Sequence, residues 1–184
     1  MAQERAMLTF LEGSPNPLRN RVIFLLSMRA GLRAKEIAGL TWDMVTDAEG
    51  HVCDTIELRD SVTKGNSGGT IPIARDLKQS LSELKIAAPD VVAGSNVVVT
   101  QRRQSTSAQV VVNMFSGWYR ALGFDGCSSH SGRRTFITRA ARNIGRFGGS
   151  LRDVQELARH RSIGMTQRYI EVERDAIRKV VDHC

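Results

Sequence analysis

The chain has 184 residues, of which 41% are hydrophobic, 24% charged and 5% aromatic, and its formal net charge is +7. This length and composition indicate a single folded domain with a hydrophobic core and exclude a disordered or fibrous protein. Because the sequence has neither a run of about 18 apolar residues nor a signal-peptide pattern at its start, we expect no membrane span and a cytoplasmic location.

The N-terminal region is predicted to be helical. The spacing of apolar residues predicts helices over residues 6–11, 18–29 and 34–40, and Gly31 is expected to end the second of them. Arg33 is then expected in a tight turn between two helices.

Farther along the chain, β-branched residues replace the helical pattern. Residues 55–63 and 70–73 are predicted to form an antiparallel hairpin, joined by the sequence Lys64-Gly-Asn-Ser-Gly-Gly69. We therefore expect Lys64 at the start of a mobile, glycine-rich loop.

Helical periodicity returns after the hairpin. Helices are predicted over residues 74–86, 108–122, 131–144, 151–159 and 165–181. Ser107 is an expected N-cap, Ser150 and Asp153 have the spacing of a capping box, and Trp118 is expected in the core. The valine-rich residues 91–99 fit either a short strand or a buried connection. The predicted fold class is α+β and mainly α-helical, with one small antiparallel β-sheet, in a single domain over residues 1–184.

The positive charge is concentrated in the last third of the chain. Residues 1–129 hold 14 basic and 13 acidic side chains, whereas residues 130–180 hold 12 and 5. Of the 26 basic residues 21 are arginine, whose planar guanidinium suits bidentate contacts with phosphate. This pattern favours a polyanionic partner such as nucleic acid, although a GC-rich genome, which favours arginine codons, or a solvated basic face would give the same composition.

The cysteines and histidines do not have the spacing of a metal site. The chain has three cysteines, an odd number, and they are far apart at Cys53, Cys127 and Cys184. The four histidines show no HxxxH pattern. We expect plain thiols, no metal and no cofactor.

Several polar side chains are candidates for chemistry, although each alone also fits a structural role. Arg33 and Glu36 have the i, i+3 spacing of a surface ion pair, and Lys64 could be a solvated loop residue. His160 and Tyr169 could be half-buried residues that hydrogen-bond nearby backbone groups.

Taken in chain order, these residues form a recognisable set. Its motifs are Ala30-Gly-Leu-Arg33-Ala-Lys-Glu36, the hairpin Lys64, His130-Ser-Gly-Arg133, and Glu156-Leu-Ala-Arg-His160 followed by Thr166-Gln-Arg-Tyr169. With these motifs the sequence resembles the catalytic domain of the tyrosine recombinases, also called the phage integrase family, over nearly its whole length.

This resemblance implies a site-specific recombinase or integrase that cleaves and rejoins DNA strands through a covalent 3′-phosphotyrosyl intermediate. The implied catalytic residues are Arg33, Lys64, His130, Arg133, His160 and Tyr169. Tyr169 would attack the scissile phosphate, and Lys64 would protonate the 5′ leaving oxygen. Arg33 and Arg133 would hold the two non-bridging oxygens.

The resemblance also implies supporting residues and partners. His130 would transfer a proton or hold the phosphate and tyrosine, His160 would donate a hydrogen bond to a phosphate oxygen, and Glu36 would orient its neighbours. Further DNA-contacting residues are expected at Arg134, Arg159, Arg161 and Arg168. The expected partners are double-stranded DNA at a recombination site and further copies of the chain, in a dimer or tetramer on DNA. The residues after Tyr169 could dock on a neighbouring copy or pack in cis.

The sequence departs from the family pattern in three places. The resemblance does not include the N-terminal DNA-binding domain that most members have, so we expect either a catalytic fragment or a naturally short member comparable to the fimbrial inversion recombinases. Gly132 replaces a usually apolar residue, which we expect to remove a core anchor and loosen the helix start. Ala158-Arg159 replaces Leu-Gly before His160, so Arg159 is expected either to contact DNA or to shift His160.

Two other functions fit the same residues. A non-catalytic DNA-binding remnant or regulator would keep the fold, but the presence of every catalytic residue favours an active enzyme. A type IB topoisomerase-like protein would use the same tyrosine chemistry to relax supercoils instead of exchanging strands.

Overall fold

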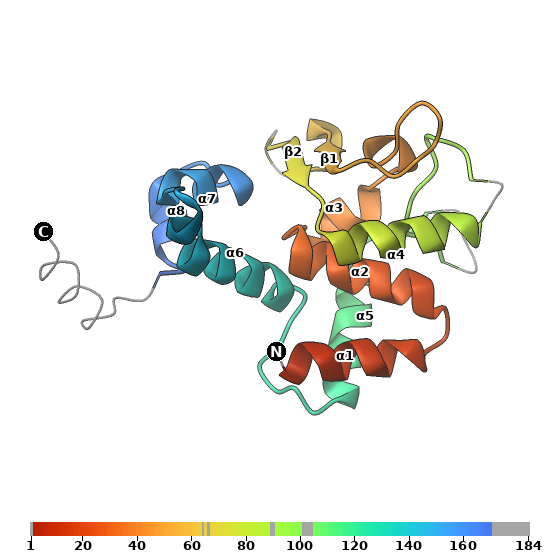
Figure 1. Cartoon of the computed structure of the whole chain (residues 1–184). Helices are drawn as coiled ribbons and strands as arrows, with labels where there is room; N and C mark the ends of the chain where they lie inside the picture. The colour runs from red at the N-terminus through yellow and green to blue at the C-terminus, as the bar shows by residue number, and fades with distance from the viewer. Residues whose placement is uncertain (1, 64, 66, 89–90, 101–104, 171–184) are drawn as a thin grey trace, which may run out of the picture. The chain divides into compact units, whose positions relative to one another are not determined.

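The computed structural model describes residues 2–63, 65, 67–88, 91–100 and 105–170 (Figure 1). The chain divides into two compact units, residues 1–136 and 137–184, and the division falls inside helix α6 (Ser131–Asn143). Within the part of the chain that the structure describes, no helix is long and apolar enough to cross a bilayer.

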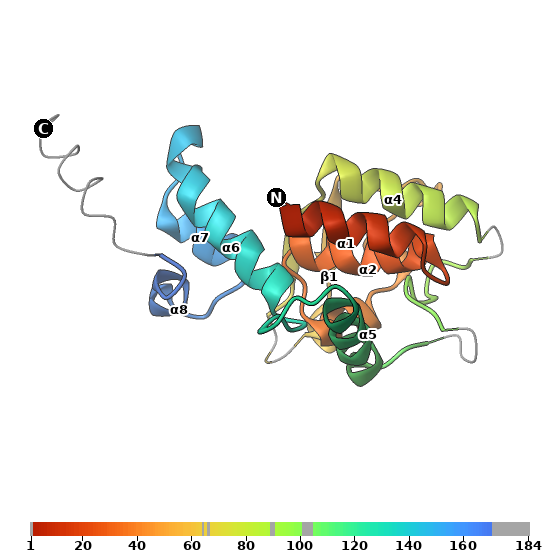
Figure 2. The ribbon, with the colours of Figure 1, turned by 90° about the horizontal axis from the view of Figure 1, so that it is seen from below.

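The first unit is built around helix α2 (Pro17–Arg29). Every residue from Val22 to Met28 is buried, as expected for a helix packed on all sides. Helices α1 (Ala2–Glu12) and α4 (Arg75–Ile86) pack against α2, and Figures 1 and 2 show the three side by side. The predicted helices over residues 18–29 and 74–86 are confirmed, whereas α1 begins earlier than the predicted residue 6.

A second helical pair lies next to α2. Helix α3 (Ala34–Gly39) contacts both α2 and α5 (Ala108–Ala121). Ser107 caps α5, because its hydroxyl accepts a hydrogen bond from the Val110 N–H, and Trp118 is 8% exposed and packs edge-on against Phe115. The predictions of an N-cap and a core tryptophan in this helix are therefore confirmed.

The small sheet is a two-stranded antiparallel hairpin. Strand β1 (Thr55–Leu58) pairs with β2 (Gly69–Pro72) in a register that sets Thr55 opposite Pro72. The first strand is shorter than predicted, because the chain turns into the 3-10 helix η2 (Asp60–Val62). The Thr63 N–H donates to the Asp60 carbonyl in this turn, so residues 60–63 cannot continue the ladder.

The valine-rich residues 91–99 form an irregular connection that is neither a strand of the sheet nor buried as a whole, since Val92 is 70% exposed and Val99 is 41% exposed. Their backbone is bonded to the chain around the 3-10 helix η1 (Trp42–Met44), with the Trp42 N–H donating to Ser95 and the Val97 N–H donating to Leu40. Within residues 91–99 only Val97 and Val98 are buried, so burial accounts for that pair and not for the rest of the apolar run.

The second unit continues α6 into three short helical segments. These are the 3-10 helix η3 (Ile144–Phe147), α7 (Leu151–Leu157) and α8 (Ile163–Gln167), and α7 contacts the other two. The predicted capping box is present at the start of α7: Asp153 accepts from the backbone and hydroxyl of Ser150, which lowers the pKa of the Asp153 carboxyl. The last predicted helix lies outside the described residues beyond residue 170.

Candidate functional site

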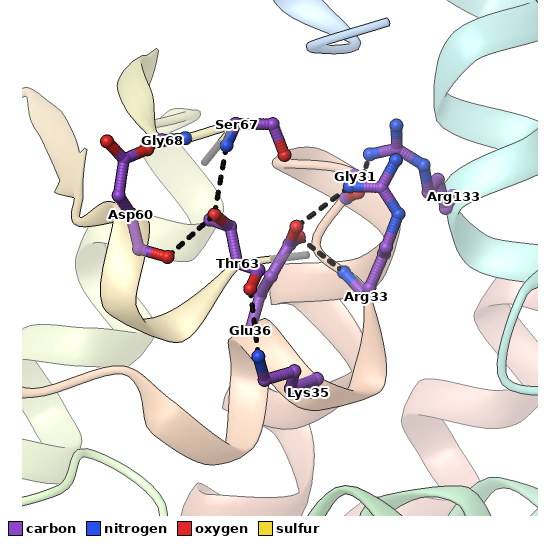
Figure 3. Close-up of polar contacts among 9 residues, drawn as sticks. All are labelled: Gly31, Arg33, Lys35, Glu36, Asp60, Thr63, Ser67, Gly68 and Arg133. Atoms are coloured by element: carbon purple, nitrogen blue, oxygen red, sulfur yellow. Dashed lines mark hydrogen bonds and ion pairs between the residues drawn. The ribbon is translucent and has the colours of Figure 1, made fainter. Parts of the chain in front are cut away.

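Arg33 is held at the start of α3 by a buried carboxylate. It lies between α2 and α3, as the sequence predicted, where it is the N-cap residue of α3, and Glu36 is at the N3 position. Glu36 is 1% exposed, and its two oxygens accept hydrogen bonds of 2.8 Å from the Arg33 backbone N–H and from Nη1 of the guanidinium. The charge-assisted hydrogen bond from Nη1 to Glu36 thereby fixes the orientation of the partly exposed Arg33 guanidinium (Figure 3).

Arg133 reaches the same turn from the start of α6. Its side chain is buried, and Nη1 donates a 2.6 Å hydrogen bond to the carbonyl of Gly31. Gly31 has a φ of +62°, and a Cβ atom there would lie 3.0 Å from Cε1 of Phe136, so only glycine fits this turn. The Arg133 guanidinium therefore binds the turn that directly precedes Arg33 (Figure 3).

His130 and Arg134 flank Arg133 along the chain. His130 precedes α6, and its backbone carbonyl accepts the Arg134 N–H at 2.9 Å. Both residues are exposed. The histidine, like Arg133, belongs to the first unit.

Gly132 has a different role from the one expected. It is buried in the first turn of α6, and a Cβ atom there would lie 2.9 Å from Cβ of Ser27 in α2. The missing side chain lets the backbone of α6 approach α2 closely, and we find a tight helix contact where we expected a loosened helix start.

Lys64 lies outside the described residues, but both ends of its loop are described. Lys35, two residues after Arg33, donates from Nζ to the Thr63 carbonyl at 2.8 Å, and Thr63 is 4% exposed. The Ser67 N–H donates to the Thr63 hydroxyl at 3.1 Å, and the Gly68 N–H donates to Asp60 at 2.9 Å. The loop that carries Lys64 thus begins and ends at a bonded turn next to α3 (Figure 3).

His160 and Tyr169 come together in the second unit. Their rings are stacked, with centroids 5.7 Å apart and an interplanar angle of 26°. His160 is 7% exposed, and its Nδ1 lies 2.9 Å from the hydroxyl oxygen of Thr166. Thr166 also accepts the Tyr169 backbone N–H at 3.0 Å, so it contacts both residues.

Arg159 adopts a left-handed backbone conformation directly before His160. Its φ is +53°, and it follows the C-cap residue Ala158 of α7. The Arg159 N–H donates to Glu156 and the His160 N–H donates to Gln155, which together form a Schellman motif. This motif usually has glycine at the position of Arg159. Among the other predicted DNA-contacting residues, Arg161 and Arg168 are exposed.

Sequence reasoning missed the residues that hold the predicted ones in place. Thr166 could have been found from its spacing, since it is three residues before Tyr169 and so lies on the same side of a helical turn. Lys35 and Thr63 gave no such signal, because a lysine on a short helix and a threonine at a strand end are common. Among the described residues, no group of three histidine, cysteine, aspartate or glutamate side chains is placed to hold a metal ion.

A family profile decides the classification. The profile described as "Phage integrase family" matches residues 1–175. The chain belongs to the phage integrase family.

Curated relatives in this family are tyrosine recombinases. The chain is 26% identical over 166 residues to tyrosine recombinase XerC of Brucella suis biovar 1, covering 89% of this chain and 50% of the relative. It is 30% identical over 157 residues to XerC of a Methylobacterium species (84% and 46%) and 28% identical over 160 residues to XerD of Lacticaseibacillus casei (84% and 51%). The chain thus spans about half the length of these curated relatives.

Solved structures of a recombinase and of a transposon integrase show the same fold. The XerA recombinase crystal structure matches with a TM-score of 0.73 and 20% identity, covering all of this chain and 63% of that one. A Tn1549 transposon integrase in complex with circular intermediate DNA matches with a TM-score of 0.73 and 22% identity (99% and 65%). The predicted fold class, that of a tyrosine recombinase catalytic domain, is therefore confirmed.

Proposed function

We propose that this chain is the catalytic domain of a site-specific DNA recombinase that cleaves and rejoins strands through a 3′-phosphotyrosyl bond. The observation that carries the proposal is the stacked pair of His160 and Tyr169, which sets a phenol beside a hydrogen-bonding imidazole. The arrangement of Arg33 and Arg133 around one turn supports it, since two guanidinium groups suit the two non-bridging oxygens of a phosphodiester.

In the proposed cleavage step, the Tyr169 hydroxyl oxygen attacks the scissile phosphorus and the bond to the 5′ oxygen breaks. Lys64 gives a proton to that oxygen, and His130 takes part in removing the proton of the tyrosine. Arg33, Arg133 and His160 stabilise the charge that develops on the non-bridging oxygens. The new phosphotyrosyl ester conserves the energy of the broken bond, so a 5′ hydroxyl from a second strand can reverse the reaction without a nucleotide cofactor.

Double-stranded DNA is the proposed substrate, and exposed arginines in both units support this. Arg161 and Arg168 are exposed on either side of α8, and Arg134 is exposed on α6 of the first unit. Each would neutralise a backbone phosphate and add to the salt dependence of binding. We also propose that the active form contains two or four copies on paired sites, as strand exchange between two duplexes requires.

The decisive experiment combines the protein with nicked suicide duplexes that carry candidate attachment sites. A covalent protein–DNA band on a denaturing gel is expected for the wild-type chain and not for Tyr169→Phe. If duplexes are bound but no band forms, even with a longer protein that includes the preceding domain, the chain is a DNA-binding remnant. Strand exchange between two labelled duplexes, in contrast to relaxation of a supercoiled plasmid, separates a recombinase from a topoisomerase.

The role of Lys64 has its own test. Lys64→Ala is expected to slow cleavage by about 100-fold or more while DNA binding stays nearly unchanged. A substrate with sulfur in place of the 5′ bridging oxygen should restore the rate, because a thiolate leaves without a proton (thiol pKa about 8.5). Equal losses in binding and cleavage would instead make Lys64 a DNA-contacting residue.

A further inference from the structure

We propose that Thr166 is a positioning residue that fixes the tautomer of His160. The Thr166 side chain is completely buried, and its hydroxyl oxygen lies 2.9 Å from Nδ1 of His160. The importance of this bond for catalysis rests on the proposed function, whereas the bond itself is a property of the second unit alone.

The direction of the hydrogen bond follows from the burial of Thr166. A threonine hydroxyl carries one proton, and a buried donor without an acceptor is strongly unfavourable. Among the residues that the structure describes, Nδ1 of His160 is the one hydrogen-bond partner of this hydroxyl. If the ring donated to the hydroxyl instead, the hydroxyl proton would have no acceptor there. The hydroxyl therefore donates and Nδ1 accepts.

An accepting Nδ1 determines where the imidazole proton lies. A neutral histidine has one protonated ring nitrogen, and the bond made by the other nitrogen selects which one it is. Neutral His160 thus carries its proton on Nε2. With this tautomer, Nε2 can donate to a phosphate oxygen without first gaining a positive charge, which is the role proposed for His160.

Thr166 also forms hydrogen bonds with both His160 and the proposed nucleophile Tyr169. Its carbonyl accepts the Tyr169 backbone N–H at 3.0 Å, while its hydroxyl binds the His160 ring. The His160 backbone is fixed independently, because its N–H donates to Gln155 and its carbonyl accepts from the Gln155 side chain at 3.0 Å. Loss of the hydroxyl should therefore change the tautomer and the ring orientation and leave the chain path unchanged.

The first test is a nuclear magnetic resonance measurement on the full chain without DNA. The ¹⁵N shifts of the His160 ring, assigned with a His160→Gln variant, report which nitrogen is protonated in the neutral form. We expect the Nε2–H tautomer in the wild-type chain and in Thr166→Ser, and a mixture or the Nδ1–H tautomer in Thr166→Val. A wild-type ring protonated on Nδ1 would overturn the proposal, whatever the behaviour of the variants.

The second test measures covalent complex formation on the suicide duplex. Thr166→Val is expected to slow it by about tenfold or more, whereas Thr166→Ser should recover most of the rate. Thr46→Val removes a hydroxyl that donates to the Trp42 carbonyl in the first unit, and it is the matched control that should keep the wild-type rate. If no variant forms a complex, the proposed function fails while the tautomer measurement still decides the role of Thr166. A Thr166→Val protein that has the changed tautomer but the full rate would overturn the positioning role.

Discussion

Gly132 and Ser27 are in direct contact where the start of α6 meets α2. A Cβ atom on Gly132 would lie 2.9 Å from Cβ and 3.2 Å from the carbonyl carbon of Ser27, whose side chain is fully buried. This contact lies one residue before Arg133, so the position of that guanidinium depends on how closely the two helices approach.

Gly132→Ala is expected to destabilise the protein by about 1–2 kcal/mol. The added methyl group overpacks the contact with Ser27, and the higher helix propensity of alanine offsets only part of the cost. Gly117→Ala in α5 is the matched control, because no atom lies within 4 Å of its added Cβ, and it should stabilise by about 0.5–1 kcal/mol. Urea unfolding measures both, and equal effects at the two sites would contradict the tight contact.

Ser27→Ala tests the same contact from the other helix. Among the described residues the Ser27 hydroxyl has no hydrogen-bond partner, so its removal is expected to be neutral or to stabilise by about 1 kcal/mol. The double variant with Gly132→Ala should be more stable than the two single effects predict, by about 0.5 kcal/mol or more, because the smaller neighbour relieves part of the overlap. If the stability changes of the two single variants simply add in the double variant, the strain caused by Gly132→Ala does not arise from contact with the Ser27 side chain.

This contact shows what the sequence could and could not predict. Helix positions were predictable because the 3.6-residue apolar period and the caps at Ser107 and Ser150 are local signals. The close approach of Gly132 to Ser27 joins residues that are far apart in the chain, and no local pattern reports it. The valine-rich residues 91–99 stayed ambiguous because a short apolar run in a sequence does not separate a strand from an irregular connection.

The sequence predicted where some candidate site residues lie in the fold, but it did not predict the contacts that hold them. Arg33 was expected in a turn, and the structure adds that Glu36 binds both its backbone and its guanidinium. Arg133 was expected beside the phosphate, and the structure adds that it is anchored on the Gly31 carbonyl. Such contacts depend on tertiary packing, which a single sequence does not display.

Glu36→Gln is expected to lower both stability and activity, but to lower activity less than Arg33→Ala does. A glutamine offers one acceptor oxygen to the two Arg33 donors, so one partly buried donor faces an amide NH₂ at a cost of about 1–3 kcal/mol. We expect about a tenfold loss in cleavage rate, compared with 100-fold or more for Arg33→Ala. Glu83→Gln, which weakens a partly exposed ion pair with Arg21, is the control and should change stability by less than about 1 kcal/mol. Equal rate losses for Glu36→Gln and Arg33→Ala would mean that Glu36 contacts the reacting groups itself.

Lys35→Met tests the proposed role of Lys64 as general acid through a residue that would not itself contact the reacting groups. The variant keeps the apolar stem but loses the ammonium that holds the Thr63 carbonyl, directly before Lys64. Cleavage of ordinary DNA should slow by about tenfold, and a 5′ bridging sulfur should restore the rate because that leaving group needs no proton. Lys78→Met, which removes an exposed ion pair with Asp54, should leave both rates unchanged. An equal loss on the two substrates would instead assign Lys35 to DNA binding or folding.

Tyr119 is expected to make the stability of the protein fall in alkaline solution. Burial, with a smaller contribution from Cys127, raises the pKa of Tyr119 to about 12, compared with about 10 for an exposed tyrosine. Between these values the unfolded chain releases a proton that the folded chain keeps, so stability is complete below about pH 10 and is lost as the pH rises toward 12. Unfolding of wild type and Tyr119→Phe at increasing pH should show a difference that grows across this range. A constant difference would mean that Tyr119 ionises normally.

Arg159→Gly is expected to distinguish two effects of this residue: the stability lost to its left-handed backbone conformation and the DNA affinity gained from its positive charge. At a φ of +53° an arginine is strained, and glycine relieves the strain at the price of a more flexible unfolded chain, for a net gain of about 0.5–1 kcal/mol. Slower hydrogen exchange at the His160 amide, which donates to Gln155, would report this gain locally.

The same variant should bind DNA more weakly. If Arg159 neutralises one phosphate, the slope of log K against log salt should decrease in magnitude by about one, whereas Arg159→Lys should keep both the slope and the strain. A glycine variant with the wild-type salt slope would remove Arg159 from the DNA-contacting residues. A glycine variant with faster exchange at His160 would show that the arginine side chain stabilises the end of α7 by more than its backbone strain costs.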